Sequence, residues 1–441
     1  MTEANGTITR NRSGAAGADP DEYEIVDQYA AQEAWLALLR GNTGSVLPRL
    51  TDAQWSWFVQ EAARHDLRNL AYRLLADDST LEPPASVLET LRPPYVQTAI
   101  RNAQLFRETS QITRCLTAQG IPVMLLKGMH LARYVYAEPG LRSMGDVDIM
   151  VQREQLAATE QIFLERGYGP TPRPDLEEFC RWSNHLARLT KPNAPIYEVH
   201  WSIERPTSPF RIDLDGLWAR SQAATLDGSP VHLLSVEDLV LHLALHSSYH
   251  HRFDRAALKG MADIHAVLVR HSGAIDWPAL LERAVAWGAS GFLYSTLRLT
   301  SQILATPVPQ SFFNDLPRER DDEDVIDVAR RFILIPRPEL PKAYVKLARS
   351  QSLRDRAELL VANLFLPRAK MERVYGLQRG SRLVWAYYPL RLVTLLFTRT
   401  SLSVSALFRT RRMRAPLDRE DERLRIQAWV KDLPGDHRPP R

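Results

Sequence analysis

The spacing of apolar residues predicts that the N-terminal part of the chain is helical. Behind Thr51, which is a plausible N-cap, apolar residues recur at helical spacing. Two adjacent prolines then interrupt the pattern, and a longer helix is expected over Val87–Ala118. We therefore expect residues 21–119 to form a helical region. The preceding residues 1–20 are polar and rich in Gly, Ala, Thr and Asn, which predicts a disordered tail.

The pattern changes at residue 120, where short apolar runs begin to alternate with helical segments. The predicted strands are Val123–Leu126, Val147–Val151, His185–Thr190 and Ile196–Trp201, and the predicted helices are Met129–Tyr136 and Glu154–Arg166. Residues 120–205 are therefore expected to form a small mixed sheet with helices. Helical regions are expected at 206–317 and 318–441. The charged run that opens the second region is expected to be a linker or a solvated helix face, with the linker favoured. The predicted fold class is α+β.

Composition narrows the class of protein. The chain is long enough for two or three domains. Its 56 Lys and Arg residues against 52 Asp and Glu are too evenly balanced to argue for nucleic-acid binding by themselves. Cys115 and Cys180 fit neither a disulfide framework nor a metal-ligand spacing. The polar N-terminus lacks a signal-peptide segment, and no apolar run reaches the roughly 18 residues of a transmembrane helix. We therefore expect a cytoplasmic protein without a transmembrane helix.

Three acidic residues in strand-like runs are the strongest candidates for chemistry. Asp146 and Asp148 are one residue apart, so on a strand they share a face. Such a pair can hold one or two hard cations such as Mg²⁺. Glu198, in a later apolar run, would supply the third carboxylate of a two-metal site. The alternative is a turn at Asp146 that leads into an edge strand with Asp148 exposed.

Lys127 and Gly128 lie where the first predicted strand ends and a helix begins. A helix N-terminus presents free N–H groups and a partial positive charge, which suits a phosphate. The glycine would let the backbone approach closely, and the lysine adds a mobile cation. The alternative is a tight turn with a solvated lysine.

Together these residues resemble the nucleotidyltransferase superfamily of DNA polymerase β type. The nearer resemblance is to an uncharacterised bacterial nucleotidyltransferase family with the pattern LLKG, Tyr, Arg, Asp-x-Asp and a later acid. The matching residues here are Leu125-Leu126-Lys127-Gly128, Tyr134 or Tyr136, Arg142, Asp146-Val147-Asp148 and Glu198-Val199-His200-Trp201. The superfamily usually has a small residue after the turn glycine, whereas this chain has Met129. Met129 keeps its backbone N–H available but takes away a hydroxyl or a small surface near the triphosphate.

The resemblance implies a polymerase-β-like core flanked by helical regions. It implies transfer of a nucleoside monophosphate from an NTP to a small-molecule, peptide or protein acceptor, with Mg²⁺ or Mn²⁺ as cofactor. Asp146 and Asp148 would hold both ions, and Glu198 would hold the catalytic ion and help to activate the acceptor hydroxyl. The residues implied in nucleotide binding are Lys127, Gly128, Met129, Arg142 and Arg188. Of these, Arg142 would pair with a phosphate or fix the Asp-x-Asp strand, and Arg188 would neutralise charge in the transition state.

Two other interpretations stay open. Nucleotidyltransferase toxins, which modify RNA or protein, share a Lys-Gly turn and an Arg-Ser-x-Asp-x-Asp pattern, and Arg142-Ser143 before Gly145-Asp146 is a partial match. A non-catalytic scaffold that kept the fold is the competing class. An intact set of three acids argues against a scaffold, because unused buried carboxylates destabilise a fold.

Three histidines have the spacing of one helix face. His242, His246 and His250 are each four residues apart, which is a spacing that can bind zinc. The favoured alternative is a polar groove wall near the active site or a hydrogen-bonded core position. Asp263 is expected to hydrogen-bond one of these histidines.

The C-terminal region carries a one-sided charge. Between residues 368 and 414 the cations Arg368, Lys370, Arg373, Arg379, Arg382, Arg391, Arg399, Arg409, Arg411, Arg412 and Arg414 face only Glu372. We expect this segment to contact an anionic partner, which would be the acceptor, nucleic acid or a membrane surface, or else to be a solvated rim. The apolar run Leu383–Phe397 lies inside it. The run would lie at a membrane surface or be buried, and the buried interpretation is favoured.

Overall fold

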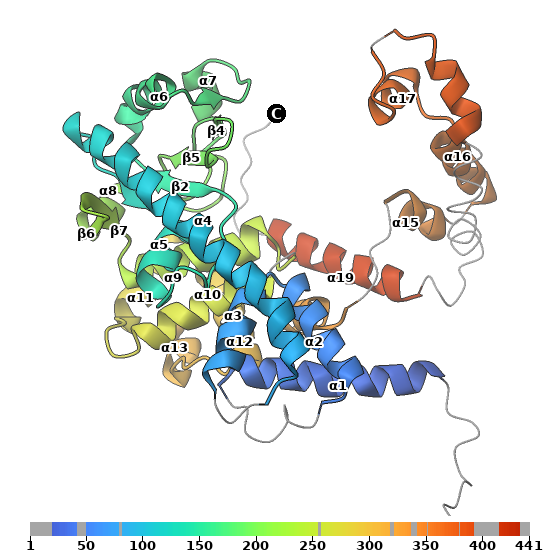
Figure 1. The fold of residues 1–441 in the computed structure, drawn as a ribbon, viewed down its shortest axis with the longest axis horizontal. Helices are drawn as coiled ribbons and strands as arrows, with labels where there is room; N and C mark the ends of the chain where they lie inside the picture. The colour runs from blue at the N-terminus through green and yellow to red at the C-terminus, as the bar shows by residue number, and fades with distance from the viewer. Residues whose placement is uncertain are drawn as a thin grey trace, which may run out of the picture. The chain divides into compact units, whose positions relative to one another are not determined.

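A computed structural model gives the fold of the chain (Figure 1). It describes residues 20–41, 50–78, 82–254, 257–317, 322–336, 342–350, 352–378, 380–391 and 414–432. Within them the fold is α+β, with a seven-stranded mixed sheet and helices before and after it in the chain, as predicted. The chain divides into two units. The first comprises Met1–Ala244, Leu258–Ser290 and Thr300–Leu316, and the second comprises Leu245–Ala257, Gly291–Leu299 and Pro317–Arg441.

Four helices precede the sheet. They are α1 (Pro20–Leu39), α2 (Asp52–Arg64), α3 (Arg68–Asp77) and α4 (Ala85–Ala118). The expected N-cap at Thr51 is confirmed, because the Thr51 side chain accepts from the Gln54 backbone and the Gln54 side chain accepts in return from the Thr51 backbone. Gly120, just beyond α4, has a φ of +72°, the left-handed conformation in which a glycine commonly ends a helix.

The sheet has the strand order β3-β4-β5-β2-β1-β7-β6. Its strands are β1 (Met124–Leu125), β2 (Val147–Met150), β3 (Gly169–Pro170), β4 (Leu189–Thr190), β5 (Tyr197–His200), β6 (Gln222–Leu226) and β7 (Ser229–Leu233). β2 lies antiparallel to β1 and parallel to β5, and in the parallel ladder Asp148 is opposite Glu198. The strand predicted at 185–190 is shorter than expected, since only Leu189–Thr190 is a strand, and His185 forms an isolated bridge to His200.

The short connecting helices of this region are α5 (Lys127–His130), the π-helical turn η2 (Leu131–Val135), the 3-10 turn η3 (Arg153–Gln155), α6 (Leu156–Glu165), α7 (Leu176–Cys180) and α8 (Leu214–Ala219). The hairpin of β6 and β7 corrects the prediction that residues 206–317 are helical throughout. Its turn is Asp227-Gly228, and both residues have positive φ, at 45° and 81°. An Asp-Gly pair between apolar runs is a strong hairpin signal.

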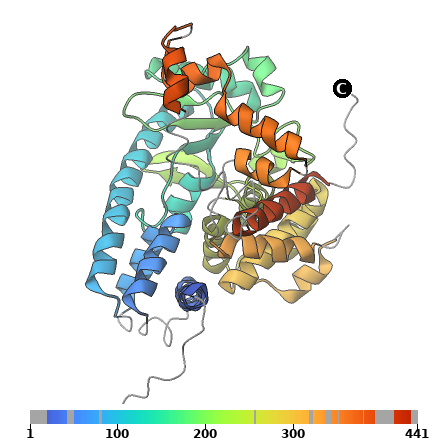
Figure 2. The same ribbon diagram turned by 90° about the vertical axis from the view of Figure 1, so that its right-hand side faces the viewer.

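The hydrophobic core packs α4 against one face of the sheet (Figures 1 and 2). Because strand side chains alternate between faces, Val147 and Ile149 of β2 join Val199 of β5 in this core. Asp148 and Glu198 must then point to the opposite face. The same alternation that fills the core therefore directs the acidic residues away from it.

Helices follow the sheet along the chain. They are α9 (Val236–Leu245), the π-helical turn η4 (His246–His250), α10 (Ala257–Arg270), α11 (Trp277–Trp287), α12 (Ser290–Leu304), α13 (Gln310–Asp315), α14 (Glu323–Leu334), α15 (Lys342–Arg349), α16 (Leu353–Leu364), α17 (Arg368–Val374) and α19 (Arg414–Lys431). α14 begins inside the charged run, so from Glu323 onward the run is helical and the favoured linker was wrong. Within the second unit, Trp429 packs against Phe253 and Phe292, with ring centroids 6.2 and 4.8 Å away, and donates to Asp322.

The C-terminal basic segment is only partly described. Arg379 and residues 392–413, which include the end of the apolar run Leu383–Phe397, lie outside the described residues. In the described part, Val384 is buried, but Leu383 and Trp385 are 65% and 63% exposed. The expectation that the run is buried is therefore wrong for Leu383 and Trp385. None of the described helices combines the length and apolar character that a bilayer-spanning segment needs.

Candidate active site

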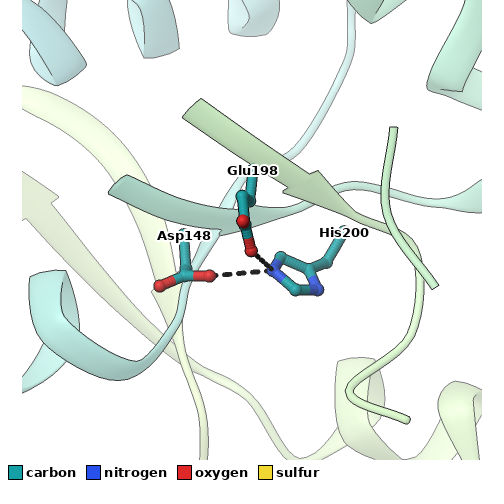
Figure 3. Close-up of side chains that lie close together, drawn as sticks. All are labelled: Asp148, Glu198 and His200. Carbon is teal, nitrogen blue, oxygen red and sulfur yellow. Dashed lines mark hydrogen bonds and ion pairs between the residues drawn. The ribbon is translucent and has the colours of Figure 1, made fainter. Parts of the chain in front are cut away.

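The candidate site lies on two neighbouring parallel strands. Asp148 of β2 and Glu198 of β5 are ladder partners, and His200 lies two residues beyond Glu198 on the same strand face. Figure 3 shows the three side chains converging, and one ligand atom from each lies within 4.8 Å of the others. Asp146 precedes β2 by one residue and is half-buried. The structure thus brings the two predicted carboxylates Asp148 and Glu198 together.

Asp148 is held by two nitrogen donors. Its Oδ1 accepts from Lys127 Nζ and from His200 Nε2, each at 2.9 Å. Burial disfavours the charged carboxylate, but the positive charge of Lys127 and the His200 hydrogen bond outweigh burial and hold the pKa of Asp148 well below its ordinary value. Asp148 is therefore ionised at neutral pH, although it is only 5% exposed.

The other two carboxylates have different surroundings. Glu198 Oε1 accepts from Arg188 Nε at 2.6 Å, and Glu198 Oε2 lies 3.8 Å from His200 Nε2. Arg188 therefore lies beside Glu198, one residue before β4. Burial raises the pKa of Asp146, and the negative charges of Asp148 and Glu198 raise it further.

These groups fit a divalent cation by their chemistry. Three carboxylates face Lys127 and Arg188, and burial together with Lys127 lowers the pKa of His200, so the imidazole is neutral. With three carboxylates against two cationic side chains, the site has an excess of acidic groups. Carboxylate oxygens are the ligands that Mg²⁺ and Mn²⁺ prefer. A divalent cation would relieve the repulsion that raises the pKa of Asp146.

The strand-to-helix turn places Lys127 and Gly128 beside the carboxylates. α5 begins at Lys127, directly after β1, and Lys127 has a φ of +40°. A Cβ on Gly128 would lie 2.8 Å from Nη1 of Arg142 and 3.0 Å from Cγ of Met144. The space at this glycine is thus taken by the protein's own side chains. Met129 is fully buried in the core, so only its backbone could face a nucleotide.

Arg142 is bound inside the protein. Its Nε and Nη2 donate to the two carboxylate oxygens of Asp263 at 3.0 and 2.9 Å, and its Nη1 donates to the Ser143 carbonyl at 3.2 Å. Tyr136 also donates to Asp263, at 2.9 Å. Of the two roles expected for Arg142, fixing the loop that leads into β2 agrees with these contacts, because the guanidinium is engaged with Asp263 and Ser143. The pairing of Asp263 with a histidine is corrected: its partners are Arg142 and Tyr136.

The three histidines are not part of the convergent group. His242 lies in α9, whereas His246 and His250 lie in the π-helical turn η4, with ring centroids 5.9 Å apart. His246 Nε2 lies 3.0 Å from His251 Nε2. In the described part of the chain, the group whose ligand atoms converge is Asp148, Glu198 and His200. His242, His246 and His250 are not in this group, so the described part of the chain gives no support to a zinc site there.

Two site residues were missed from the sequence. His200 was part of the quoted motif but had no role, although its position two residues after Glu198 on a strand places it on the same face. Asn184 lies 16 residues from His200 in sequence, and its Nδ2 lies 3.4 Å from His200 Nδ1. The pairing of these two residues depends on the chain reversal between β4 and β5, which no local pattern predicts.

A polar cavity of about 320 Å³ lies beside the loop that precedes Asp146. Its lining includes Ser143 and Met144 of that loop, with Arg68, Asn69 and Arg101 from α3 and α4 among the other residues. Arg101 donates to the carbonyl of Gly145 at 3.1 Å, which ties the cavity wall to the loop. At 3.8 Å per residue, the Cα of Ser143 lies within about 11 Å of the Cα of Asp146. The cavity therefore adjoins the loop that leads to Asp146, although none of the three carboxylates lines it.

Comparison with known proteins identifies a family for this chain. The model of an uncharacterised nucleotidyltransferase family matches residues 51–305, which is more than half of the chain and includes every carboxylate of the site. A solved structure, an antigenic nucleotidyltransferase-like protein from Paracoccidioides brasiliensis, matches at 15% identity with a TM-score of 0.30, over 48% of this chain and 97% of that one. No curated protein matches significantly. On the family match, the chain belongs to the uncharacterised nucleotidyltransferase family.

Proposed function

We propose that this protein is a metal-dependent nucleotidyltransferase that moves an NMP from an NTP to an acceptor. The observation that carries the proposal is the parallel pairing of β2 with β5, which sets Asp148 directly opposite Glu198 with Asp146 one residue before the strand. Neighbouring carboxylates on one sheet face are the ligand set for one or two Mg²⁺ or Mn²⁺ ions. Family membership supports the transferase class.

Each residue of the site has a task in this proposal. Asp146 and Asp148 would hold both cations, and Glu198 would hold the catalytic one. When bound, the cations would neutralise charge on the triphosphate. The acceptor oxygen forms a bond to the α-phosphorus, the bond to the bridging oxygen breaks, and pyrophosphate leaves. Glu198 would assist removal of the acceptor proton, and Lys127 and Arg188 would offset negative charge on the phosphates.

The cavity beside the loop that precedes Asp146 favours a small acceptor group. Its volume of about 320 Å³ is at the lower end for ligand sites, which suits a small molecule or a single side chain. Arg68 and Arg101 in its lining favour an acceptor that carries an anionic group next to its hydroxyl, because Asp66, which also lines the cavity, is paired with Lys259. An RNA acceptor of the toxin type would need a larger surface than this cavity.

The test is transfer itself. The protein is incubated with Mg²⁺ or Mn²⁺ and each α-labelled NTP in turn, with anionic hydroxy compounds, total RNA or protein as acceptors, and pyrophosphate release is measured. The Asp148→Asn variant is the control for contaminating activity. Release with wild type alone supports the proposal, and the acceptor that takes up the label distinguishes the acceptor classes. No release with any NTP would favour the non-catalytic scaffold.

We also propose an anionic lipid surface as the partner of the basic C-terminal segment. The exposed apolar residues Leu383 and Trp385 follow the exposed cation Arg382. Apolar side chains beside basic ones fit the boundary of an anionic bilayer better than solvent. Co-sedimentation with phosphatidylserine and with phosphatidylcholine vesicles tests this. Binding to neither vesicle, or to RNA alone, would refute it.

A further inference from the structure

His200 is the most buried polar group of the candidate site, at 2% exposure, and the proposed transfer assigns it no task. We propose that His200 is a positioning residue: it holds Asp148 by one carboxylate oxygen and leaves the other oxygen for the cation, without binding the cation itself. This inference rests on the proposed function, because it presumes that a cation binds at Asp148.

The hydrogen-bond partners of His200 determine which ring nitrogen carries the proton. Oδ1 of Asp148 already accepts from Lys127, so Nε2, 2.9 Å from the same oxygen, is a second donor to it. At the other end of the ring, Nδ1 faces the side-chain amide of Asn184. The Asn184 Nδ2 also donates to the Ser202 carbonyl at 3.0 Å, and this bond directs the NH₂ group, rather than the amide oxygen, toward His200. Both ends of the ring therefore require the same neutral tautomer, with the proton on Nε2.

The chain from Asn184 through His200 to Asp148 is anchored in the sheet. The backbone carbonyl of Asn184 accepts from the Trp201 amide at 2.9 Å, next to His200 on the same strand. Asn184, His200 and Ser202 are all buried, so water does not compete for these bonds. His200 is thus a fixed donor at the bottom of the site.

Asp148 consequently has two unequal oxygens. Oδ1 accepts from both Lys127 and His200, which uses its two lone pairs. Oδ2 points away from His200, as Figure 3 shows. Oδ2 is therefore the oxygen that can bind a cation together with Asp146 and Glu198. The resulting ligand set is all oxygen.

Direct ligation by His200 conflicts with the same contacts. A cation on Nε2 would require the ring proton to move to Nδ1, where it would meet the NH₂ group of Asn184. Two donors would then face each other in a buried place, unless Asn184 turned and gave up its bond to Ser202. A metal-bound histidine normally donates its second N–H to an acceptor. The surroundings of His200 provide a donor there instead.

The experiment compares two substitutions with Mn²⁺ as the probe, followed by EPR titration without nucleotide. His200→Gln keeps an amide N–H that can reach Asp148, and His200→Leu removes the donor. We expect His200→Gln to bind Mn²⁺ within about threefold of wild type and His200→Leu to bind it at least about tenfold more weakly. His265→Leu is the matched control, because His265 bonds Thr306 away from the carboxylates, and it should leave the affinity unchanged.

Two further measurements separate positioning from ligation. Pulsed EPR of the Mn²⁺-loaded wild type should show no directly coordinated nitrogen. NMR of ¹⁵N-histidine-labelled protein should show His200 as the Nε2–H tautomer in metal-free protein and with Mg²⁺. A coordinated nitrogen that disappears in His200→Gln, or wild-type affinity in His200→Leu, would overturn the inference. No Mn²⁺ binding by wild type would overturn both it and the proposed function, whereas His200-dependent binding without NMP transfer would overturn the proposed function alone.

Discussion

Two carboxylates of the site are expected to change the stability of the metal-free protein in opposite directions. Asp148 accepts from Lys127 and His200, whereas Asp146 has a pKa raised by burial and by the charges of Asp148 and Glu198. Asp148→Asn should therefore destabilise the metal-free fold. Asp146→Asn should stabilise it, because a neutral amide removes the repulsion. Both variants should lose NMP transfer by orders of magnitude, since each removes a proposed metal ligand.

The size of each effect follows from the contacts. Lys127 is 17% exposed in its side chain and lies 2.9 Å from Asp148. Removing one partner of a buried ion pair costs about 3–5 kcal/mol. Because Lys127 also faces Glu198 and Asp146, we expect Asp148→Asn to cost less, about 2–3 kcal/mol of unfolding free energy. Asp146 is half-buried and partly screened, so the gain from Asp146→Asn is at most about 1 kcal/mol.

Urea denaturation in EDTA, followed by tryptophan fluorescence, measures both effects on the full-length chain. The same titrations in excess Mg²⁺ provide the second comparison. Wild type should gain about 1.4 kcal/mol for each tenfold excess of Mg²⁺ over its dissociation constant, and both variants should gain less. The stability order in EDTA should be Asp146→Asn, wild type, Asp148→Asn.

The result that would refute this reasoning is a loss of stability in Asp146→Asn, or a metal-free Asp148→Asn protein as stable as wild type. The first would mean that Asp146 has a favourable partner. The second would mean that the ion pair between Lys127 and Asp148 contributes nothing to the fold.

Three further predictions concern the roles of Lys127 and Glu198, the buried His130 and the exposed Trp385. Lys127→Ala should raise the KM for NTP more than it lowers kcat, whereas Glu198→Gln should lower kcat with little change in KM; steady-state kinetics would show the reverse pattern if the two roles were exchanged. Burial lowers the pKa of His130 to about 3, below its value of about 6.5 in the unfolded chain. The unfolded chain therefore binds a proton more readily, and stability is lost as the pH falls below about 6.5. The expected loss is about 1.4 kcal/mol at pH 5.5 relative to pH 8. His130→Phe should remove that part of the acid sensitivity in urea titrations at the two pH values, and an unchanged sensitivity would contradict the assignment. Trp385→Asp should weaken co-sedimentation with phosphatidylserine vesicles. Equal binding by the variant would mean that Trp385 does not contact the lipid.

The sequence predicted the acidic residues because their signal is local. Asp146 and Asp148 are separated by one residue in an apolar run, and period-two alternation is enough to place them on one face. Glu198 could be added because it lies in a similar run. The Asp227-Gly228 pair is an equally local signal for a hairpin. The prediction of a helical region at 206–317 gave it no weight, because the apolar pattern beyond the pair favours helices.

The rest of the site depends on contacts between distant parts of the chain. Arg142 and Asp263 are 121 residues apart, and only the fold shows that a buried carboxylate takes up this guanidinium. The orientation of the His200 ring likewise depends on Asn184, which reaches it by pairing across the sheet. Residue type and spacing predict which side chains share a face, but they do not predict which partner each polar atom finds.

The interleaving of the two units has a practical consequence for expressing fragments. The family match ends at residue 305, which suggests a natural place to cut the chain. Phe253 and Phe292, however, lie before that point and belong to the second unit, where they pack on Trp429. A fragment ending at residue 305 would expose both rings to water and invite aggregation. Residues 51–305 and the C-terminal helices therefore have to be produced as one chain. An inactive short fragment would not test whether the carboxylates are catalytic.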